Sequence, residues 1–325
     1  MRLDHVNLET LNMIELRDYQ KTDLEAYLRF SKRNFDARSY QSNIQFLSWL
    51  EKNSSRSLKI ALYEGNIIGC SHGYEVPISS GEKIANFFIV HDIMTDKKHR
   101  TAGIKLMKDS VLRNQPVLLS GASGKISEMY KRIGATKISS FWYRKFLLPK
   151  KLFKKSLILK NERLKFHDFP GFCIYSNKAP ENRTDIKKFL KKFKLIEEQE
   201  NFLYWRFFED NAPTNYFLSK KDNSSGLIFS IGKSKFFPII RIFSISAENK
   251  ESKIKLIKCV EKFAKENGIF IILISLITQN PLPEELNYKP YNEMPDVYWF
   301  SKDKTKSFAP ILEGLHTDMG FNGYI

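Results

Sequence analysis

A basic turn with a glycine, Lys97 to Gly103, follows an apolar run and precedes a helical pattern. The apolar run, Phe87–Met94, is continuous and too short for a helix, which predicts a buried strand. After the turn, apolar residues recur at helical spacing from Ile104 to Val111. A strand that feeds a helix through such a turn presents free backbone N–H groups at the positive end of the helix dipole. The spacing therefore predicts an anion site suited to a diphosphate.

Four side chains that could accept a proton lie on two predicted neighbouring strands just before this turn. They are His72, Glu75, His91 and Asp92. Imidazole and carboxylate groups commonly act as general bases in enzymes. A polar residue on a strand is more often a satisfied structural group, and water could also serve as the base, so both alternatives stay open. We predict Asp92 and His91 as catalytic residues, and His72 and Glu75 as substrate-binding residues.

The elements that must position these groups follow a regular order. Before residue 150 the patterns predict a strand, two helices, a three-stranded meander, a helix, a strand, a helix and a strand. Glu64-Gly65-Asn66 is a hairpin turn signal within the meander. The last helix, Ser123–Ile133, ends at Gly134, and the last strand is Phe141–Leu148.

This order and two motifs resemble the GCN5-related N-acetyltransferase (GNAT) superfamily. The superfamily's pyrophosphate loop reads Arg/Gln-x-x-Gly-x-Gly/Ala, and this chain has Arg100, Gly103 and Lys105 at the three marked positions. A later superfamily motif has a helical Tyr, then a Gly four residues on, then an aromatic residue. The chain matches it with Tyr130 and Gly134. It departs at Lys105, where a small residue is usual, and at Ala135, which replaces the aromatic residue.

The resemblance implies direct transfer of an acyl group from CoA to an amine, or less often a hydroxyl, without a covalent enzyme intermediate. It implies acetyl-CoA or another acyl-CoA as co-substrate and no metal. Tyr130 matches the position of the acid that protonates the CoA thiolate, and a phenol with a pKa of about 10 can donate to a thiolate of about 8.5. The alternative is a Tyr130 ring that only packs in the core. The residues expected to contact the diphosphate or the pantetheine arm are Ile93, Met94, Thr95, Lys98, Arg100, Thr101, Ala102, Gly103, Ile104 and Lys105.

The second half of the chain repeats the plan of the first half. A helix pattern, Glu251–Asn267, is followed by an apolar strand, Gly268–Ile277, at the spacing found in the first half. The loop before this helix, Ala247–Ser252, has no glycine and contains two glutamates, which would repel a diphosphate. We therefore expect one acyl-CoA site, in the first half.

These patterns predict an α/β (α+β) protein of two GNAT-like domains, each a mixed, mostly antiparallel twisted sheet flanked by helices. The N-terminal domain is expected at residues 1–149, a basic linker at 150–165, and a degenerate, substrate-binding or structural domain at 166–325. Tyr204 and Arg206 of the second domain are predicted to contact the acceptor. The alternative for these two residues is core packing, because aromatic side chains dominate cores.

Composition sets limits on partners and compartment. The net charge of +17 favours anionic partners such as CoA, nucleotide sugars, tRNA or an anionic membrane surface, although a lysine-rich genome background would also produce it. The three cysteines show no paired framework, and the N-terminus has no apolar signal segment, which fits a reducing cytoplasm. The longest apolar run is too short to cross a bilayer, which takes about 20 residues.

The favoured hypothesis is acyl-CoA-dependent acylation of a small acceptor such as an amino sugar or a sugar nucleotide, as in surface polysaccharide synthesis. One alternative is an aminoacyl-tRNA-dependent transferase of the FemX type, which also has two GNAT-like halves but does not use CoA. The other is a non-catalytic binding protein with this fold. The sequence leaves open the acceptor, the acyl chain length, N- against O-acylation and the oligomeric state.

Overall fold

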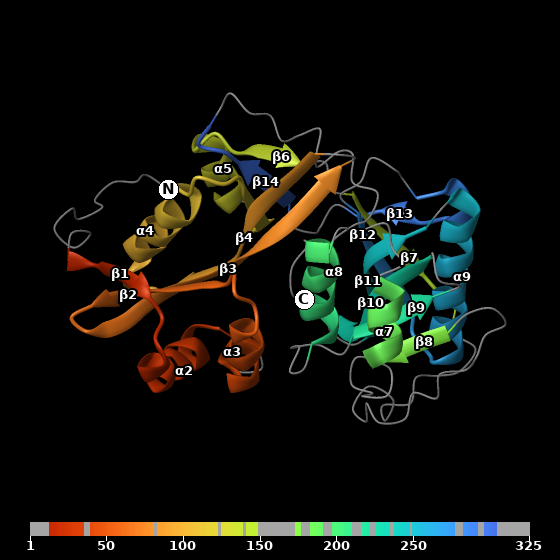
Figure 1. Ribbon diagram of the computed structural model, residues 1–325, viewed down its shortest axis with the longest axis horizontal. Helices are drawn as coiled ribbons and strands as arrows, with labels where there is room; N and C mark the ends of the chain where they lie inside the picture. Colours follow the sequence, from red (N-terminus) through yellow and green to blue (C-terminus); the bar gives the residue numbers. More distant parts are fainter. Residues whose placement is uncertain are drawn as a thin grey trace. The chain divides into compact units, whose positions relative to one another are not determined.

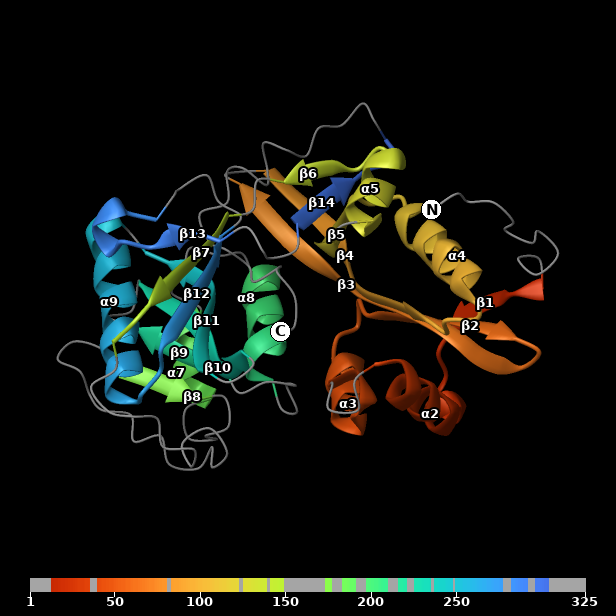
Figure 2. The ribbon, with the colours of Figure 1, turned by 180° about the vertical axis from the view of Figure 1, so that it is seen from behind.

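The computed structural model has two mixed β-sheets, each with helices packed on it (Figures 1 and 2). The structure describes residues 13–35, 40–80, 83–122, 125–138, 141–148, 173–176, 183–190, 197–209, 216–220, 225–234, 237–247, 249–276, 282–291 and 296–303. The predicted basic linker, residues 150–165, lies outside these ranges.

The first sheet has seven strands in the order β1-β2-β3-β4-β5-β14-β6. Its β2–β3 hairpin turns at Glu64 and Gly65, whose φ angles are 49° and 75°. Two consecutive positive φ angles are typical of a type I′ turn, so the predicted hairpin is confirmed. Strands β4 and β5 are parallel, with Val90 opposite Leu119. The strands are β1 (Glu15–Asp18), β2 (Ser57–Tyr63), β3 (Asn66–Ser80), β4 (Lys83–Thr95), β5 (Val117–Ala122), β6 (Thr136–Ile138) and β14 (Asp296–Phe300).

Helices cover both faces of the first sheet (Figure 1). On one face, helix α4 packs Leu106 in a buried cluster with Ile68 of β3. On the other face, α2 and α3 place the rings of Tyr27 and Phe46 at 6.0 and 5.3 Å from the His72 ring. These helices are α2 (Leu24–Asn34), α3 (Ile44–Glu51), α4 (Arg100–Val111) and α5 (Lys125–Arg132).

The second sheet repeats the strand order of the first. It runs β13-β7-β12-β11-β10-β9-β8, which in the reverse direction places a parallel pair, β11 and β12, where the first sheet has β4 and β5. Ile242 lies opposite Ile274 in this pair. The internal repeat predicted from spacing is therefore present as a repeated topology. The strands are β7 (Phe141–Phe146), β8 (Cys173–Ser176), β9 (Tyr216–Lys220), β10 (Gly226–Ser234), β11 (Phe237–Ser246), β12 (Ile271–Leu276) and β13 (Lys289–Pro290).

The two copies exchange one strand, and this corrects the predicted chain boundaries. Strand β7, expected in the N-terminal domain, pairs with β12 of the second sheet, whereas β14 fills the corresponding position between β5 and β6 of the first. The two units consequently comprise residues 1–76, 86–137 and 298–307, and residues 77–85, 138–297 and 308–325. The two strands are equivalent members of the repeat, so each can complete either sheet with the same backbone pairing.

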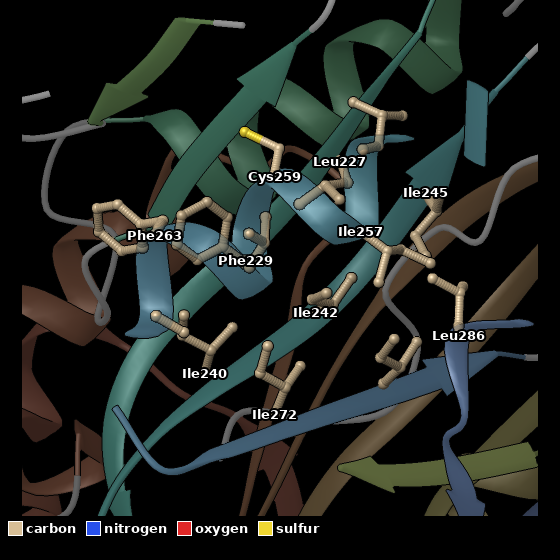
Figure 3. Packing of buried hydrophobic residues seen from close by; sticks show 14 of the residues in the cluster. Leu227, Phe229, Ile240, Ile242, Ile245, Ile257, Cys259, Phe263, Ile272 and Leu286 are labelled. Atoms are coloured by element: carbon tan, nitrogen blue, oxygen red, sulfur yellow. The ribbon is translucent and has the colours of Figure 1, made fainter. Parts of the chain in front are cut away.

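The core of the second unit lies between its sheet and helix α9 (Figure 3). Helix α9 carries Ile257, Val260 and Phe263 on one face, and these side chains pack against Ile240 and Ile242 of β11. The apolar residues spaced along the helix and those alternating along the strand therefore pack into one cluster. Among the described helices, none is both long and apolar enough to cross a membrane. The helices of this unit are α7 (Arg183–Leu190), α8 (Glu197–Leu203), a following π-helical turn (Tyr204–Phe208) and α9 (Lys250–Glu266).

A buried ion pair ties the exchanged strand β7 to the second unit. Lys145 Nζ donates to Glu261 Oε1 of α9 at 2.9 Å and to the Leu286 carbonyl at 2.6 Å. The Glu261 side chain is only 10% exposed. Its carboxylate would therefore be left without its cation in a desolvated site if Lys145 were removed.

We expect Lys145→Met to lower the free energy of unfolding by about 3 kcal/mol, because it leaves a buried charge unpaired. Urea denaturation measures this loss. The double variant Lys145→Met/Glu261→Met should recover most of it, because apolar residues of similar volume can replace a buried ion pair. Equal stability of the single and double variants would contradict this role of the pair.

Candidate functional site

The turn between β4 and α4 is held by backbone hydrogen bonds. The Asp96 N–H donates to the Ile68 carbonyl at 2.8 Å, and the His99 N–H donates to the Asp96 carbonyl at 2.9 Å. The Asp96 carboxylate accepts from Arg33 Nη2 of α2 at 2.7 Å. This ion pair offsets the one carboxylate of the turn, so the turn is less repulsive to an anion than its sequence alone suggests.

The N-terminus of α4 is suited to an anion. His99 at the N-cap makes no side-chain capping bond, and the first turn contains no acidic residue. Lys98 and Arg100 are exposed beside it. Uncapped N–H groups at the positive end of the dipole, with two cations alongside, are the features that bind phosphate groups.

Gly103 lies where α4 approaches the end of β4. A Cβ atom placed on Gly103 would lie 3.4 Å from Thr95 Cγ2, which is an ordinary contact. The fold therefore has room for alanine here, although glycine in a helix is less stable than alanine by about 1 kcal/mol. Packing does not explain the glycine, whereas the close approach of a ligand would.

The other residues predicted to contact CoA are distributed around this turn. Ile93, Met94 and Thr95 are partly buried at the end of β4, and Thr101 and Ile104 are partly buried on α4. Ala102 is fully buried. The Lys105 side chain was predicted to contact CoA, but its ammonium group donates to the Ile14 carbonyl. The contact gives a structural reason for a lysine at this position, since its stem extends toward the segment before β1.

Strand β4 is irregular where the acid–base candidates lie. Val90 and Ile93 both pack in the apolar cluster beside Met107 of α4. Residues three apart in a regular strand point to opposite faces, so the strand must contain a bulge between them. Asp92 consequently faces α2 and α3 with His72, where Gln41 Nε2 donates to Asp92 Oδ2 at 3.1 Å.

The structure brings together two of the four acid–base candidates. His72 Nδ1 lies 3.6 Å from Asp92 Oδ2. The side chain of His72 is 2% exposed and that of Asp92 is 24% exposed, so only the carboxylate can meet a substrate. Glu75 accepts from Gln115 Nε2 at 3.0 Å and lies on the opposite face of β3 from His72, since the positions differ by an odd number. His91 lies in β4, and its side chain is outside the part that the structure describes.

Tyr130 lies on α5 with its ring in the apolar core. It is 6% exposed, and its ring centroid lies 5.7 Å from that of Tyr298 in an edge-to-face contact. Burial raises the pKa of Tyr130 to about 12. Gly134, with a φ of 84°, ends the helix as predicted. The phenol therefore remains a hydrogen-bond donor throughout the neutral range.

The second unit has the same scaffold without these features. The N-terminus of α9 is capped by Asn249, whose Oδ1 accepts from the Ser252 N–H at 2.9 Å, and its first turn contains Glu251. Strand β11, which occupies the position of β4 in the second sheet, contains no aspartate or glutamate. This copy therefore has neither an open anion site at this helix nor a carboxylate on the equivalent strand.

The residues predicted to bind the acceptor in the second unit are part of its interior. Arg206 is fully buried in the π-helical turn, with its guanidinium carbon 5.0 Å from the Phe207 ring centre. Tyr204 is partly buried beneath Lys187 Nζ, 4.5 Å from its ring centre. An acceptor could reach Arg206 only after local rearrangement, and the binding role of both residues stays a prediction.

Sequence reasoning missed Tyr27 and Gln41, which complete the polar cluster around His72 and Asp92. The Tyr27 hydroxyl lies 2.9 Å from His72 Nε2. Both residues are far from β3 and β4 in the chain, and neither belongs to a motif. Cys70, by contrast, is fully buried, and burial raises the pKa of its thiol, as expected for a core residue. No group of side chains among the described residues is arranged to hold a metal ion.

Solved structures with the same fold include one named a GCN5-related N-acetyltransferase and one named a probable N-acyltransferase. Eis1 from Mycobacterium abscessus matches 89% of this chain and 73% of its own, at 12% identity and a TM-score of 0.52. A probable N-acyltransferase from Enterococcus faecalis matches 88% and 72%, at 9% identity and a TM-score of 0.56. A GCN5-related N-acetyltransferase from Kribbella flavida matches 88% and 70%, at 12% identity and a TM-score of 0.53. No protein-family model and no curated protein sequence matches the chain. At these identities the similarity shows the fold, which is the one predicted from the sequence.

Proposed function

We propose that this chain, which has the fold of the GCN5-related N-acetyltransferases, transfers an acyl group from acyl-CoA to an amine or hydroxyl of a small acceptor. The observation that carries the proposal is the difference between the two copies of the fold. One helix N-terminus is uncapped, basic and free of carboxylates, while the equivalent helix is capped by its own Asn249 and carries Glu251. Selection for stability alone would favour a cap at both helices.

The residues around α4 fit a diphosphate. The N–H groups of its first turn would bind the phosphate oxygens, with Lys98 and Arg100 supplying charge. Gly103 keeps the helix surface open where Cβ would otherwise project. When bound, acyl-CoA supplies an activated thioester, and the bulged end of β4 supplies backbone groups to orient it.

Asp92 is the residue that best fits a general base. It is the exposed member of the His72–Asp92 pair, and Gln41 already donates to its Oδ2 atom. Its carboxylate would accept the proton of the attacking amine, and the N–C bond would form as the thioester C–S bond breaks. Tyr130 would donate a hydrogen bond to the departing thiolate.

We expect Tyr130→Phe to lower kcat about tenfold, since a phenol with a pKa of about 12 stabilises a thiolate by hydrogen bonding rather than by full proton transfer. A group whose pKa is raised on folding keeps its proton as pH rises. The kcat of the unmodified protein should therefore show no loss from Tyr130 ionisation below about pH 10, the ordinary value. The folded state should lose the stability that the neutral phenol contributes between that pH and about 12. Steady-state kinetics and urea denaturation across this range measure both effects, and an unchanged kcat in Tyr130→Phe would leave the ring with a packing role only.

The acceptor is proposed as an amino sugar or a sugar nucleotide, supported by the net charge of +17, which attracts anionic molecules. Isothermal titration calorimetry with acetyl-CoA tests the donor half of the proposal. Micromolar binding is expected, followed by turnover in a screen of amino sugars and their nucleotides. Absence of binding to acetyl-CoA and longer acyl-CoAs would overturn the acyltransferase function and favour a search for tRNA or protein partners.

A further inference from the structure

Three polar side chains from three elements lie in successive contact, from the buried core to the surface. The Tyr27 hydroxyl of α2 lies 2.9 Å from Nε2 of His72, and Nδ1 of the same ring lies 3.6 Å from Asp92 Oδ2. Tyr27 is fully buried, the His72 side chain is 2% exposed, and the Asp92 side chain is 24% exposed. The first two residues therefore cannot touch a substrate, while the third can.

The neighbouring hydrogen bonds indicate that Tyr27 donates to His72, and not His72 to Tyr27. Ser31 Oγ already donates to the Gln41 carbonyl at 2.8 Å, whereas the Tyr27 hydroxyl lies 3.4 Å from that oxygen. The Tyr27 O–H therefore has its better acceptor in His72 Nε2. A ring that accepts at Nε2 carries its proton on Nδ1, the atom that faces the carboxylate.

Burial supports this direction. Desolvation raises the pKa of Tyr27 far above its ordinary value, and the charge of the Asp92 carboxylate raises it further. The hydroxyl thus remains a donor, and the rings of Phe35 and Phe46, at 6.4 and 5.3 Å, hold the imidazole on two sides. Among the described residues, the titratable side chains that face the nitrogens of the imidazole are Tyr27 from α2 and Asp92 from β4.

We propose that Tyr27 and His72 form a positioning relay: Tyr27 donates to His72 Nε2, and the Nδ1–H of the ring faces Asp92 and orients its carboxylate to accept a proton from the acceptor amine. They are positioning residues, and the transferred proton stays on Asp92 until it passes to solvent. The proposal rests on the acyltransferase function proposed above for the choice of reaction, but the relay itself is a property of the folded chain.

The contact between His72 and Asp92 is not a hydrogen bond in this structure. His72 Nδ1 and Gln41 Oε1 are buried and have no hydrogen-bond partner among the described residues. The nearest carboxylate oxygen to Nδ1, at 3.6 Å, is slightly too far for a hydrogen bond. Catalytic hydrogen bonds are often long before substrate binds, so the amine would complete this contact as it draws Asp92 into place.

The tautomer of His72 tests the relay without any activity measurement. Nitrogen-detected NMR of the full chain, labelled with 15N-histidine, distinguishes a proton on Nδ1 from one on Nε2, and the loss of one signal in His72→Gln assigns the residue. A ring with its proton on Nδ1 and a lone pair at Nε2, where Tyr27 donates, is expected. A ring protonated at Nε2 would overturn the proposal, because His72 would then present a lone pair to the Asp92 carboxylate.

Variants of His72 test its role in the reaction. An asparagine amide can replace Nδ1 toward Asp92, whereas a glutamine amide can replace Nε2 toward Tyr27. We therefore expect His72→Asn to retain about tenfold more kcat than His72→Gln, the size of one hydrogen bond. Equal losses in the two variants, at equal stability to urea, would assign His72 a purely structural role.

Tyr27→Phe removes only the hydroxyl and should lower kcat about tenfold with unchanged acetyl-CoA affinity. Tyr19→Phe is the matched control, because Tyr19 lies in the same ring cluster, 5.7 Å from Tyr27, and should keep full kcat. If the unmodified protein does not bind acetyl-CoA, the proposed acyltransferase function is overturned. The tautomer of His72 would still show whether the relay exists. If the protein binds acetyl-CoA but His72 is protonated at Nε2, the relay is overturned and the proposed function stands.

Discussion

Gly103→Glu is expected to weaken acetyl-CoA binding about a thousandfold, since a carboxylate near a diphosphate at an effective dielectric constant of about 20 costs about 4 kcal/mol. The fold should be unaffected. A Cβ atom at this position meets only Thr95 at ordinary distances of 3.4 and 3.8 Å, and an acidic residue near a helix N-terminus is favourable to the dipole. Calorimetric titration of the variant and of the unmodified protein measures the difference.

The second copy of the fold provides a matched control. Lys253 is the fourth residue of α9, as Gly103 is of α4. Lys253→Glu should leave acetyl-CoA binding unchanged, because that helix is closed by its own Asn249 cap. Gly103→Ala is a graded variant that should stabilise α4 by about 1 kcal/mol and still weaken binding. Unaltered affinity in Gly103→Glu would place the diphosphate elsewhere.

Asp92→Asn is expected to lower kcat about a thousandfold, which is within the range for loss of a general base. Asparagine has the same shape and can still accept from Gln41, so the polar cluster keeps its packing while losing the negative charge. Affinity for acetyl-CoA should remain within about twofold, because the carboxylate faces α2 and α3 and the diphosphate site is on α4. Steady-state kinetics with the best amine from the acceptor screen gives both constants.

Asp109→Asn serves as the control for this substitution. Asp109 lies on α4 and pairs with Lys59 at 3.8 Å on a partly exposed surface, where such pairs contribute little. It should retain full activity. A normal kcat in Asp92→Asn would show that water or another group accepts the proton.

Local patterns were sufficient to predict the elements of the fold. The apolar run of β4, the turn at Gly65 and the helix that ends at Gly134 depend on interactions within a few residues. Hydrophobic periodicity and turn chemistry report such interactions directly. The repeat was also visible, because the same order of elements recurs at the same spacing.

The exchange of β7 and β14 was not predictable from those patterns. Each strand has a compatible position in either sheet, and backbone pairing does not distinguish between them. Which strand joins which sheet depends on tertiary contacts between residues far apart in sequence. The hydrogen bond of Lys145 to Glu261 is one such contact. A contiguous boundary at residue 149 follows from the sequence, whereas the two interleaved units follow from this choice.

The candidate site shows the same division. The sequence by itself determined the turn that we propose as the anion site, because Arg100 and Gly103 need only a strand and a helix around them. Only the tertiary structure decided which of the candidate carboxylates lies beside His72 and stays partly exposed. A bulge in β4 turns Asp92 toward His72, and Tyr27 and Gln41 reach the pair from separate elements. Local sequence specifies the groups that act through their own backbone, whereas a cluster of side chains exists only where distant segments pack together.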